Sequence, residues 1–421
     1  MHPTPDSTVQ YIALGIFVLA LGHTFAAKQF ERLSHRFPRH AGLFHLLGEI
    51  EVVFGFWASI LILVMGLMQG GDKALTYAES RNYTEPLFVF VVMVLAASRP
   101  VLRTVIWAVD NIARVVPLPT PVASAWLGLA VVPLLGSLIT EPAAMTIAAL
   151  MLAPQIFRTR VPEPLKYLAL GVLFVNISIG GTLTSYAAPP VLMVAATWQW
   201  DSAFMSSHFG WKAAIAVVVN ATVATFVLRK HLHAPVADGT APEAPVPLPV
   251  VLVHLLLLAG VVLFAHHPVA FLGLFLMFLG FTQAYERHQS PLILKEALLV
   301  AFFLAGLVVL GGLQGWWLQP IVSSLEPLAL FFGALGLTAI TDNAALTYLG
   351  SLITGISTES KYMLVAGAVA GGGLTVIANA PNPAGVALLK RGFEDESIGA
   401  GGLLLGALGP TVMAAAAFLL L

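Results

Sequence analysis

The stretch Thr140-Glu141-Pro142-Ala143-Ala144 decides how this chain folds, and it has a near-copy at Thr341-Asp342-Asn343-Ala344-Ala345. Each copy puts one carboxylate in the middle of a long apolar segment, beside a residue that disturbs a helix. A helix break inside lipid leaves backbone polar groups unpaired, at a cost of several kcal/mol each. Such breaks persist only where protein, water or a ligand satisfies those groups, so each copy predicts a broken element at a binding site.

A second pair of matching stretches follows each copy. Gly181-Thr182-Leu183-Thr184 precedes Ala187-Ala188-Pro189-Pro190, and Gly372-Gly373-Leu374-Thr375 precedes Ala378-Asn379-Ala380-Pro381. Glycines tolerate irregular backbone, and we predict helix breaks at Gly180, Gly181, Gly372 and Gly373. Because both kinds of break recur in the same order, the sequence predicts one binding site built from two halves.

The composition places the chain in a membrane. Of 421 residues, 58% are hydrophobic and 10% are charged, against roughly 25% charged residues in soluble domains. Apolar runs of about 20 residues, long enough for a membrane helix, recur from end to end. We therefore predict an all-α polytopic membrane protein whose partner is the lipid bilayer. There are no cysteines, the net charge of -1 suggests no nucleic-acid partner, and no cofactor is expected.

The order of the breaks divides the chain into two repeats. The first is predicted over residues 1–233, with a re-entrant hairpin at 122–157 and a broken helix at 165–197. The second is predicted over residues 250–421, with a hairpin at 328–356 and a broken helix at 363–389. Each repeat would also contain about five membrane crossings. The Pro- and Ala-rich residues 234–249 are expected to form an extended linker.

The basic residues set the predicted orientation. If both broken segments are hairpins, all but four of the 20 lysines and arginines fall on one side, which the positive-inside tendency makes cytoplasmic. The exceptions are Lys73, Arg81, Lys212 and Lys361. The linker is then cytoplasmic, and so is a predicted loop that carries Arg99, Arg103 and Arg114. The two halves run in opposite directions, which is the architecture of many secondary transporters.

Other interpretations of these patterns remain open. Residues 122–157 could form one over-long helix, and the Glu-Pro and Asp-Asn pairs could cap helices at the membrane surface. The Gly-Thr stretches could be faces for close helix packing.

A carboxylate at membrane depth costs roughly 3 kcal/mol or more and is usually functional. Burial raises the pKa of a carboxyl group, whereas a bound cation lowers it, so such a group can exchange a proton for a cation. Glu141 and Asp342 are the candidates for this role. The neighbouring polar side chains that could bind a cation are Thr140, Thr184, Thr341, Thr375, Asn343 and Asn379. A sodium ion is expected at Asp342, Asn343 and Thr375, because hard cations prefer oxygen ligands.

These motifs resemble the ion transporter superfamily, which includes NhaD-type sodium/proton antiporters, arsenite exporters and sodium/dicarboxylate symporters. Ile340-Thr341-Asp342-Asn343-Ala344 looks like the Asp-Asn tip of the antiporter branch. Thr140-Glu141-Pro142-Ala143, followed by Leu152-Ala153-Pro154, looks like a more distant first tip, with Glu-Pro where relatives often have Asn. The resemblance implies a bacterial inner-membrane protein of the NhaD-like branch that carries sodium and protons and forms a homodimer.

The leading hypothesis is therefore a Na⁺/H⁺ antiporter. An alternative is sodium- or proton-coupled transport of an organic anion, or export of an oxyanion, but two tip carboxylates would repel an anion. No Lys or Arg lies next to either tip. An intramembrane enzyme is a further alternative. We do not expect one, because the sequence lacks the Gly-x-Gly-Asp and His-Glu-x-x-His motifs of intramembrane proteases.

Overall fold

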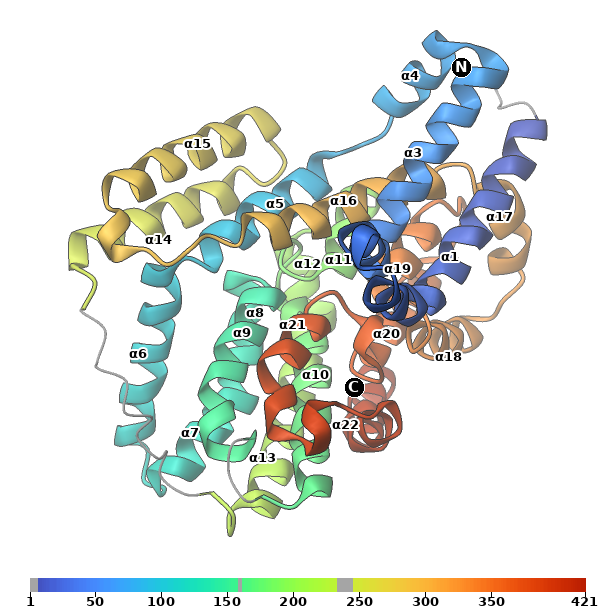
Figure 1. Cartoon of the computed structure of the whole chain (residues 1–421). Coiled ribbons are helices and arrows are strands. Elements are labelled where there is room, and N and C mark those ends of the chain that lie inside the picture. The colour runs from blue at the N-terminus through green and yellow to red at the C-terminus, as the bar shows by residue number, and fades with distance from the viewer. Residues whose placement is uncertain (1–6, 158–160, 233–244) are drawn as a thin grey trace.

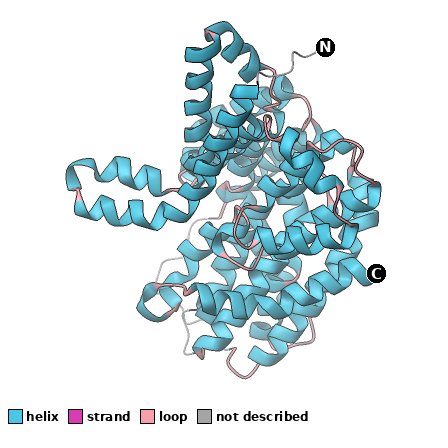
Figure 2. Cartoon of the chain, turned by 90° about the vertical axis from the view of Figure 1, so that its right-hand side faces the viewer, coloured by secondary structure: helices cyan, strands magenta, loops and turns pink. Residues whose placement is uncertain are grey.

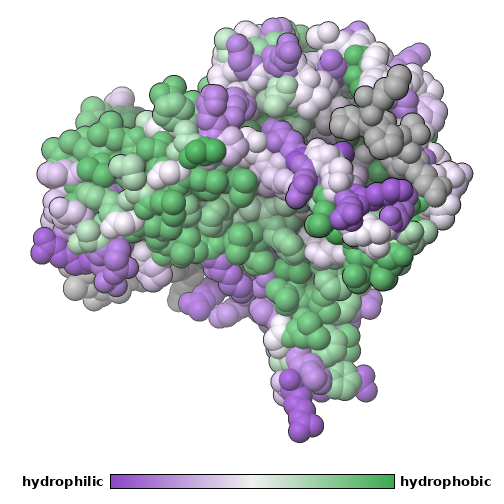
Figure 3. Space-filling view, turned by 90° about the horizontal axis from the view of Figure 1, so that it is seen from above, coloured by the Kyte–Doolittle hydropathy of each residue, from purple (hydrophilic) through white to green (hydrophobic). Residues whose placement is uncertain are grey.

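The computed structural model describes residues 7–157, 161–232 and 245–421, and every regular element in these ranges is a helix (Figures 1 and 2). Within these ranges, six helices are long and apolar enough to cross a membrane, and the number is eight if each of two sharply bent helix pairs counts as one span. Large apolar side chains are exposed in many places, and Figure 3 shows broad hydrophobic surfaces. The prediction of an all-α polytopic membrane protein is confirmed.

Six α-helices come first in the described residues. They are α1 (Ser7–Arg36), α2 (Ala41–Gly48), α3 (Ile50–Gln69), α4 (Gly71–Glu79), α5 (Thr84–Ala96) and α6 (Arg99–Val115). In Figure 1, α1, α3 and α4 lie at the upper right, α5 crosses the middle and α6 lies at the left. Helix α6 lies where we predicted a loop, and it makes an angle of 63° with α5. Its residues Val101, Val109 and Ala113 are buried at helical spacing, so one apolar face makes this arginine-bearing stretch a packed helix.

The first pair of breaks follows. Helix α7 (Thr120–Leu129) bends by 42° into α8 (Val131–Ile139), and α9 (Glu141–Leu152) packs back against both. Helix α10 (Glu163–Gly180) then continues as a 3-10 turn (Gly181–Leu183) and a non-helical stretch before α11 (Pro189–Trp198).

Six helices separate the first pair of breaks from the second. They are α12 (Ser202–Met205), α13 (Trp211–Leu228), α14 (Leu248–Leu263), α15 (Pro268–Ala284), α16 (Leu294–Gly311) and α17 (Gly315–Ser323). Residues 234–244 of the predicted linker lie outside the described residues, and its last two residues belong to α14.

The second pair of breaks has the same order as the first. Helix α18 (Pro327–Thr338) and α19 (Asn343–Ser351) flank a four-residue tip, and α20 (Thr358–Gly371) ends in a glycine-rich turn. A 3-10 turn (Val376–Ala378), α21 (Asn382–Leu389) and α22 (Ala400–Leu420) complete the chain.

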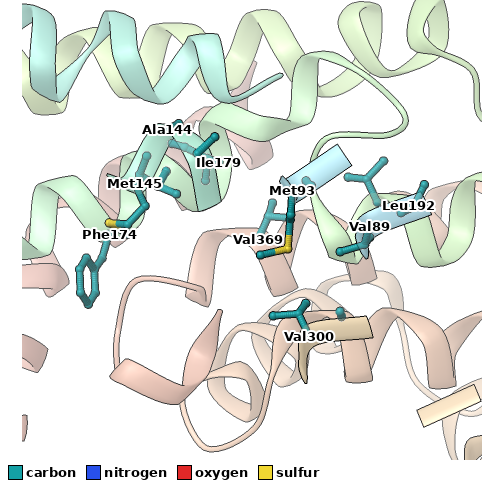
Figure 4. Close-up of a cluster of buried hydrophobic side chains, with 14 of the residues drawn as sticks. Val89, Met93, Ala144, Met145, Phe174, Ile179, Leu192, Val300 and Val369 are labelled. Atoms are coloured by element: carbon teal, nitrogen blue, oxygen red, sulfur yellow. The ribbon is translucent and has the colours of Figure 1, made fainter. Parts of the chain in front are cut away.

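Next to the breaks, helices of each half pack against helices of the other half. Helix α9 packs against α21, and α19 packs against α11, so the arm after each tip contacts the helix after the other half's break. Figure 4 shows part of this core, where Met145 of α9 lies beside Phe174 of α10. The two tips and the two breaks are therefore held in one packed region.

A regular series of contacts joins the first hairpin to α10. Three positions of α7 and α8, at intervals of four residues, offer their carbonyl oxygens to three positions spaced in the same way, two at the end of α10 and one just beyond it. These contacts are Asn176 Nδ2 to Leu129 O (2.8 Å), Gly180 against Pro133 O, and Thr184 Oγ1 to Ser137 O (2.7 Å).

The same series recurs in the second half. Each hairpin position lies 202 residues further on (Leu129 to Phe331), and each position of the following helix lies 191 residues further on (Gly180 to Gly371). The contacts are Gly367 against Phe331 O, Gly371 against Leu335 O, and Thr375 Oγ1 to Ala339 O (2.8 Å). Hairpin and broken helix therefore pack in the same register twice.

Candidate functional site

The first tip is a single residue. Helix α8 ends at Ile139, α9 begins at Glu141, and Thr140 between them has φ 80° and ψ 151°. A threonine in this region of backbone space is strained, at a cost of roughly 1–3 kcal/mol, and such strain tends to occur at functional sites. The sharp reversal places Glu141 at the start of α9, inside the packed region.

Glu141 is completely buried. Its Oε2 accepts a hydrogen bond from Asn379 Nδ2 (2.9 Å), which comes from the second half of the chain. Its Oε1 has no partner among the protein atoms and lies against Gly181, where a Cβ would be 2.6 Å from it. The first tip, the first break and the second break thus meet at one carboxylate.

The second tip presents an amide in the same way. Asn343 is completely buried, and its Nδ2 contacts Ser178 Oγ (3.4 Å) and lies beside Gly372. In the register of the repeated contacts, Asn343 is the counterpart of Glu141, and Gly372 is the counterpart of Gly181. The similarity of the two sequence stretches had paired Glu141 with Asp342, one residue earlier.

Asp342 has a different position from the one that this pairing suggests. It is half-buried and is the N-cap of α19, because its Oδ1 accepts hydrogen bonds from Ala344 N (2.8 Å) and Ala345 N (3.2 Å). Asp342 is the residue before α19, as Thr140 is the residue before α9, so it is the counterpart of Thr140 and lies outside the helix.

Several buried oxygen atoms around the breaks have no hydrogen-bond partner among the protein atoms. They are Thr140 Oγ1, Glu141 Oε1, Thr338 Oγ1, Asn343 Oδ1, Asn379 Oδ1 and Asn382 Oδ1. Buried polar atoms are almost always paired, so a group of orphan acceptors calls for an explanation. Oxygen atoms from carboxylate, amide and hydroxyl groups are the ligands that hard cations such as Na⁺ prefer.

The threonines after the breaks brace the backbone. Thr184 and Thr375 use their hydroxyl groups to bind the first arm of their own hairpin, at Ser137 O and Ala339 O. Thr341 donates to Leu337 O within its own chain segment and lies away from the buried group. Of the three expected sodium ligands, Asn343 and Thr375 lie at the second break, whereas Asp342 Oδ1 is turned to the amides of α19.

The predicted glycines allow close approach. Gly180 and Gly181 lie against Pro133 and Glu141, and Gly372 lies against Ser178 and Asn343. A Cβ on Gly373 would collide with Val175 of α10, so this glycine brings the two broken helices together.

Sequence reasoning missed several polar residues at the site. Asn382 Nδ2 donates to Gly372 O (2.8 Å) and Thr375 O (2.9 Å) and holds the second break open. Ser178 Oγ donates to Val369 O (2.8 Å) and links α10 to α20. Ser137 Oγ donates to Gly180 O (2.7 Å). The available signal was a buried polar residue within an apolar run, as at Ser178.

A polar cavity of about 450 Å³ borders the stretch that follows the first break. Ser185 lines it together with Glu85, Gln199, Asp201 and His266. The backbone N–H of Ser185 donates to Ser202 Oγ (3.2 Å). The cavity therefore reaches Ser185, which belongs to the non-helical stretch after Leu183.

In the described part of the chain, no three His, Cys, Asp or Glu side chains gather as a transition-metal site would need. Buried oxygens without a protein partner instead lie at crossed helix breaks in a polytopic membrane protein, and one of them belongs to the carboxylate of Glu141, an arrangement typical of secondary transporters. The chain belongs to the family described as "Putative Na+/H+ antiporter", whose model matches residues 8–421. It is a membrane transporter of that family.

Among solved structures, the chain is similar to the YdaH transporter of Alcanivorax borkumensis, whose crystal structure is described as having an unusual topology. The sequences are 14% identical, the match covers 88% of this chain and 97% of that chain, and the TM-score is 0.44. Comparison with curated proteins finds no match.

Proposed function

We propose that this protein is a Na⁺/H⁺ antiporter of the NhaD-like branch and that Glu141 exchanges a proton for a sodium ion. One observation carries the proposal. Glu141 is fully buried, one of its oxygens is held by Asn379, and the other has no partner while further unpaired oxygens lie around the same breaks.

The chemistry follows from the cost of a bare carboxylate in a dry environment. A buried charge must be neutralised or paired, and either a proton or a cation achieves this. A sodium ion at Glu141 Oε1 would replace its water ligands with protein oxygens, and the proton would then be released. Because the two ions compete for one group, inward movement of one drives outward movement of the other.

The two halves contribute unequally in this mechanism. Glu141 carries the charge, and its counterpart Asn343 offers a neutral oxygen. Asp342 acts from a distance by attracting cations to the second tip. We propose that Asn343 and Thr375 remain sodium ligands at the second break and that Asp342 mainly orders α19.

The proposal also covers the topology and the location of the protein. We assign the repeated contacts to two inverted repeats, 1–233 and 250–421, with the linker on the cytoplasmic side of a bacterial inner membrane. A homodimer remains an expectation from the superfamily resemblance. Coupled transport of an anion is less favoured, because an acid lies at each tip, Glu141 at the first and Asp342 at the second.

The test is exchange in proteoliposomes that contain a pH-sensitive dye, with Na⁺, Li⁺ and K⁺ added in turn. Wild-type protein should move protons when Na⁺ is added, and Glu141→Gln should abolish the response because an amide cannot exchange a proton. Asp342→Asn keeps a good N-cap and removes only the charge, so its exchange should fall without vanishing. Asp110→Asn, a carboxylate-to-amide change in α6, is the matched control and should leave exchange unchanged.

Two results would refute the proposal. Exchange that survives in Glu141→Gln would remove this residue from the mechanism. A folded wild-type protein that responds to no cation would instead favour coupled transport of an organic anion or oxyanion.

A further inference from the structure

A second cavity, of about 460 Å³, lies between α7 and α13, next to the loop that leads from α6 into α7. We call it the α7–α13 groove. Its walls are almost entirely apolar, and they include Val116, Leu118, Val122, Ala123, Trp126 and Phe226. Helix α13 belongs to a candidate membrane span, and Val223 and Phe226 on it are exposed. The groove therefore opens onto a surface that faces lipid.

The groove has a polar side and a charged end. Trp126 Nε1 donates to Thr222 Oγ1 (3.0 Å) and ties its two walls together. Thr225 is 4% exposed, and its hydroxyl oxygen has no partner among the protein atoms. Arg229 lines one end, with its guanidinium carbon 3.6 Å from the centre of the Phe226 ring.

Among the described residues that line the groove, Arg229 is the one charged side chain. Arg229 forms none of the ion pairs found within residues 7–157, 161–232 and 245–421. Lys230 is exposed beside it, and Arg114 is exposed two residues before the lining residue Val116. Basic residues at the ends of membrane helices attract anionic lipid headgroups, and pockets of this kind between helices bind them.

We propose that the α7–α13 groove binds one phospholipid with an anionic headgroup. An acyl chain would lie along the apolar walls, and the phosphate would lie against Arg229. No carboxylate among the groove-lining residues competes with the phosphate for this arginine. The acyl chain would rest on α7, which belongs to the first arm of the hairpin. The second arm of that hairpin begins at Glu141. This inference does not depend on which ion is transported.

The test is native mass spectrometry of the purified full-length protein mixed with phosphatidylglycerol or with phosphatidylcholine. The wild-type protein should retain one phosphatidylglycerol in preference to phosphatidylcholine. Arg229→Gln should weaken phosphatidylglycerol binding about fivefold and leave phosphatidylcholine unchanged, because only the charged contact is lost. Arg287→Gln, an exposed arginine after α15, is the matched control and should bind both lipids as the wild type does.

A second variant tests the apolar part of the groove. Val122→Trp places a large ring in the groove at a half-buried position and should lower retention of both lipids. Equal retention of the two lipids by the wild type would indicate ordinary boundary lipid and overturn the proposal. So would unchanged phosphatidylglycerol binding in both Arg229→Gln and Val122→Trp.

Discussion

At the scale of single residues, the site depends on how one carboxylate is held. The hydrogen bond from Asn379 Nδ2 to Glu141 Oε2 joins the two halves of the chain. A donor to a carboxylate favours its charged form, and a hydrogen bond to a charged group is worth roughly 1.5–3 kcal/mol. Asn379 should therefore help Glu141 to give up its proton and accept a cation.

Asn379→Ala tests this relation. Without the donor, the proton is held more tightly, so sodium should compete less well and the apparent KM for Na⁺ should rise roughly tenfold or more. The pH at which exchange is fastest should move upward for the same reason. Initial rates of proton release against Na⁺ concentration, at several pH values, measure both effects. An unchanged KM would mean that the contact only packs the site.

At the scale of secondary-structure elements, glycines set the distance between each hairpin and its broken helix. A Cβ on Gly180 would lie 2.6 Å from Pro133 O, and a Cβ on Gly371 would meet Leu335 O. Both contacts involve backbone, which cannot rotate away as a side chain can. Glycine occupies the middle of the three contact positions in both halves, which allows each broken helix to approach its hairpin equally closely there.

We therefore expect Gly180→Ala and Gly371→Ala to destabilise the protein to a similar degree, by roughly 1–3 kcal/mol each, as overpacking of a core does. Thermal unfolding in detergent, followed by intrinsic fluorescence, measures this. Gly273→Ala in α15 is the control, since a Cβ there has nothing within 4 Å and alanine favours a helix. If only one of the two variants lost stability, the two halves would not pack equivalently.

The elements also show what patterns in the sequence miss. The stretch with Arg99 and Arg103 was predicted as a loop because arginines at a membrane surface suggest one, yet it is helix α6. Its apolar residues repeat every four positions, and this period could have been recognised. The length of the second tip could not have been recognised from the sequence, since nothing in residues 339–342 marks where α18 ends.

At the scale of the whole molecule, the proposed inverted topology makes a prediction about sides of the membrane. The chain has no cysteine, so single cysteines can be introduced without a background. Cysteines at Asp72 and Glu359 should react with a membrane-impermeant maleimide added outside intact cells. Cysteines at Arg229 and Arg391 should react only after the membrane is permeabilised. All four positions are exposed, so labelling reports side and not burial. Labelling of Glu359 and Arg391 from the same side would contradict the topology.

The sequence by itself determined that the chain is a helical membrane protein, and it predicted one site from two carboxylate stretches and two glycine-rich stretches. Composition decides the first point, and the cost of polar groups in lipid decides the second. It also pointed to Glu141 and Asn379, because polar residues in apolar runs stand out.

Only the tertiary structure decided where these residues lie relative to one another. Glu141 and Asn379 are far apart in sequence, and packing of α9 against α21 brings them within hydrogen-bond distance. The structure also made Asn343 the counterpart of Glu141 and Asp342 the cap before α19, because Glu141 and Asn343 are the first residues of their helices and occupy the same place in the repeated contacts, one residue away from the pairing by sequence similarity. Residue similarity cannot reveal such a shift, since register depends on which backbone atoms meet across the packed helices.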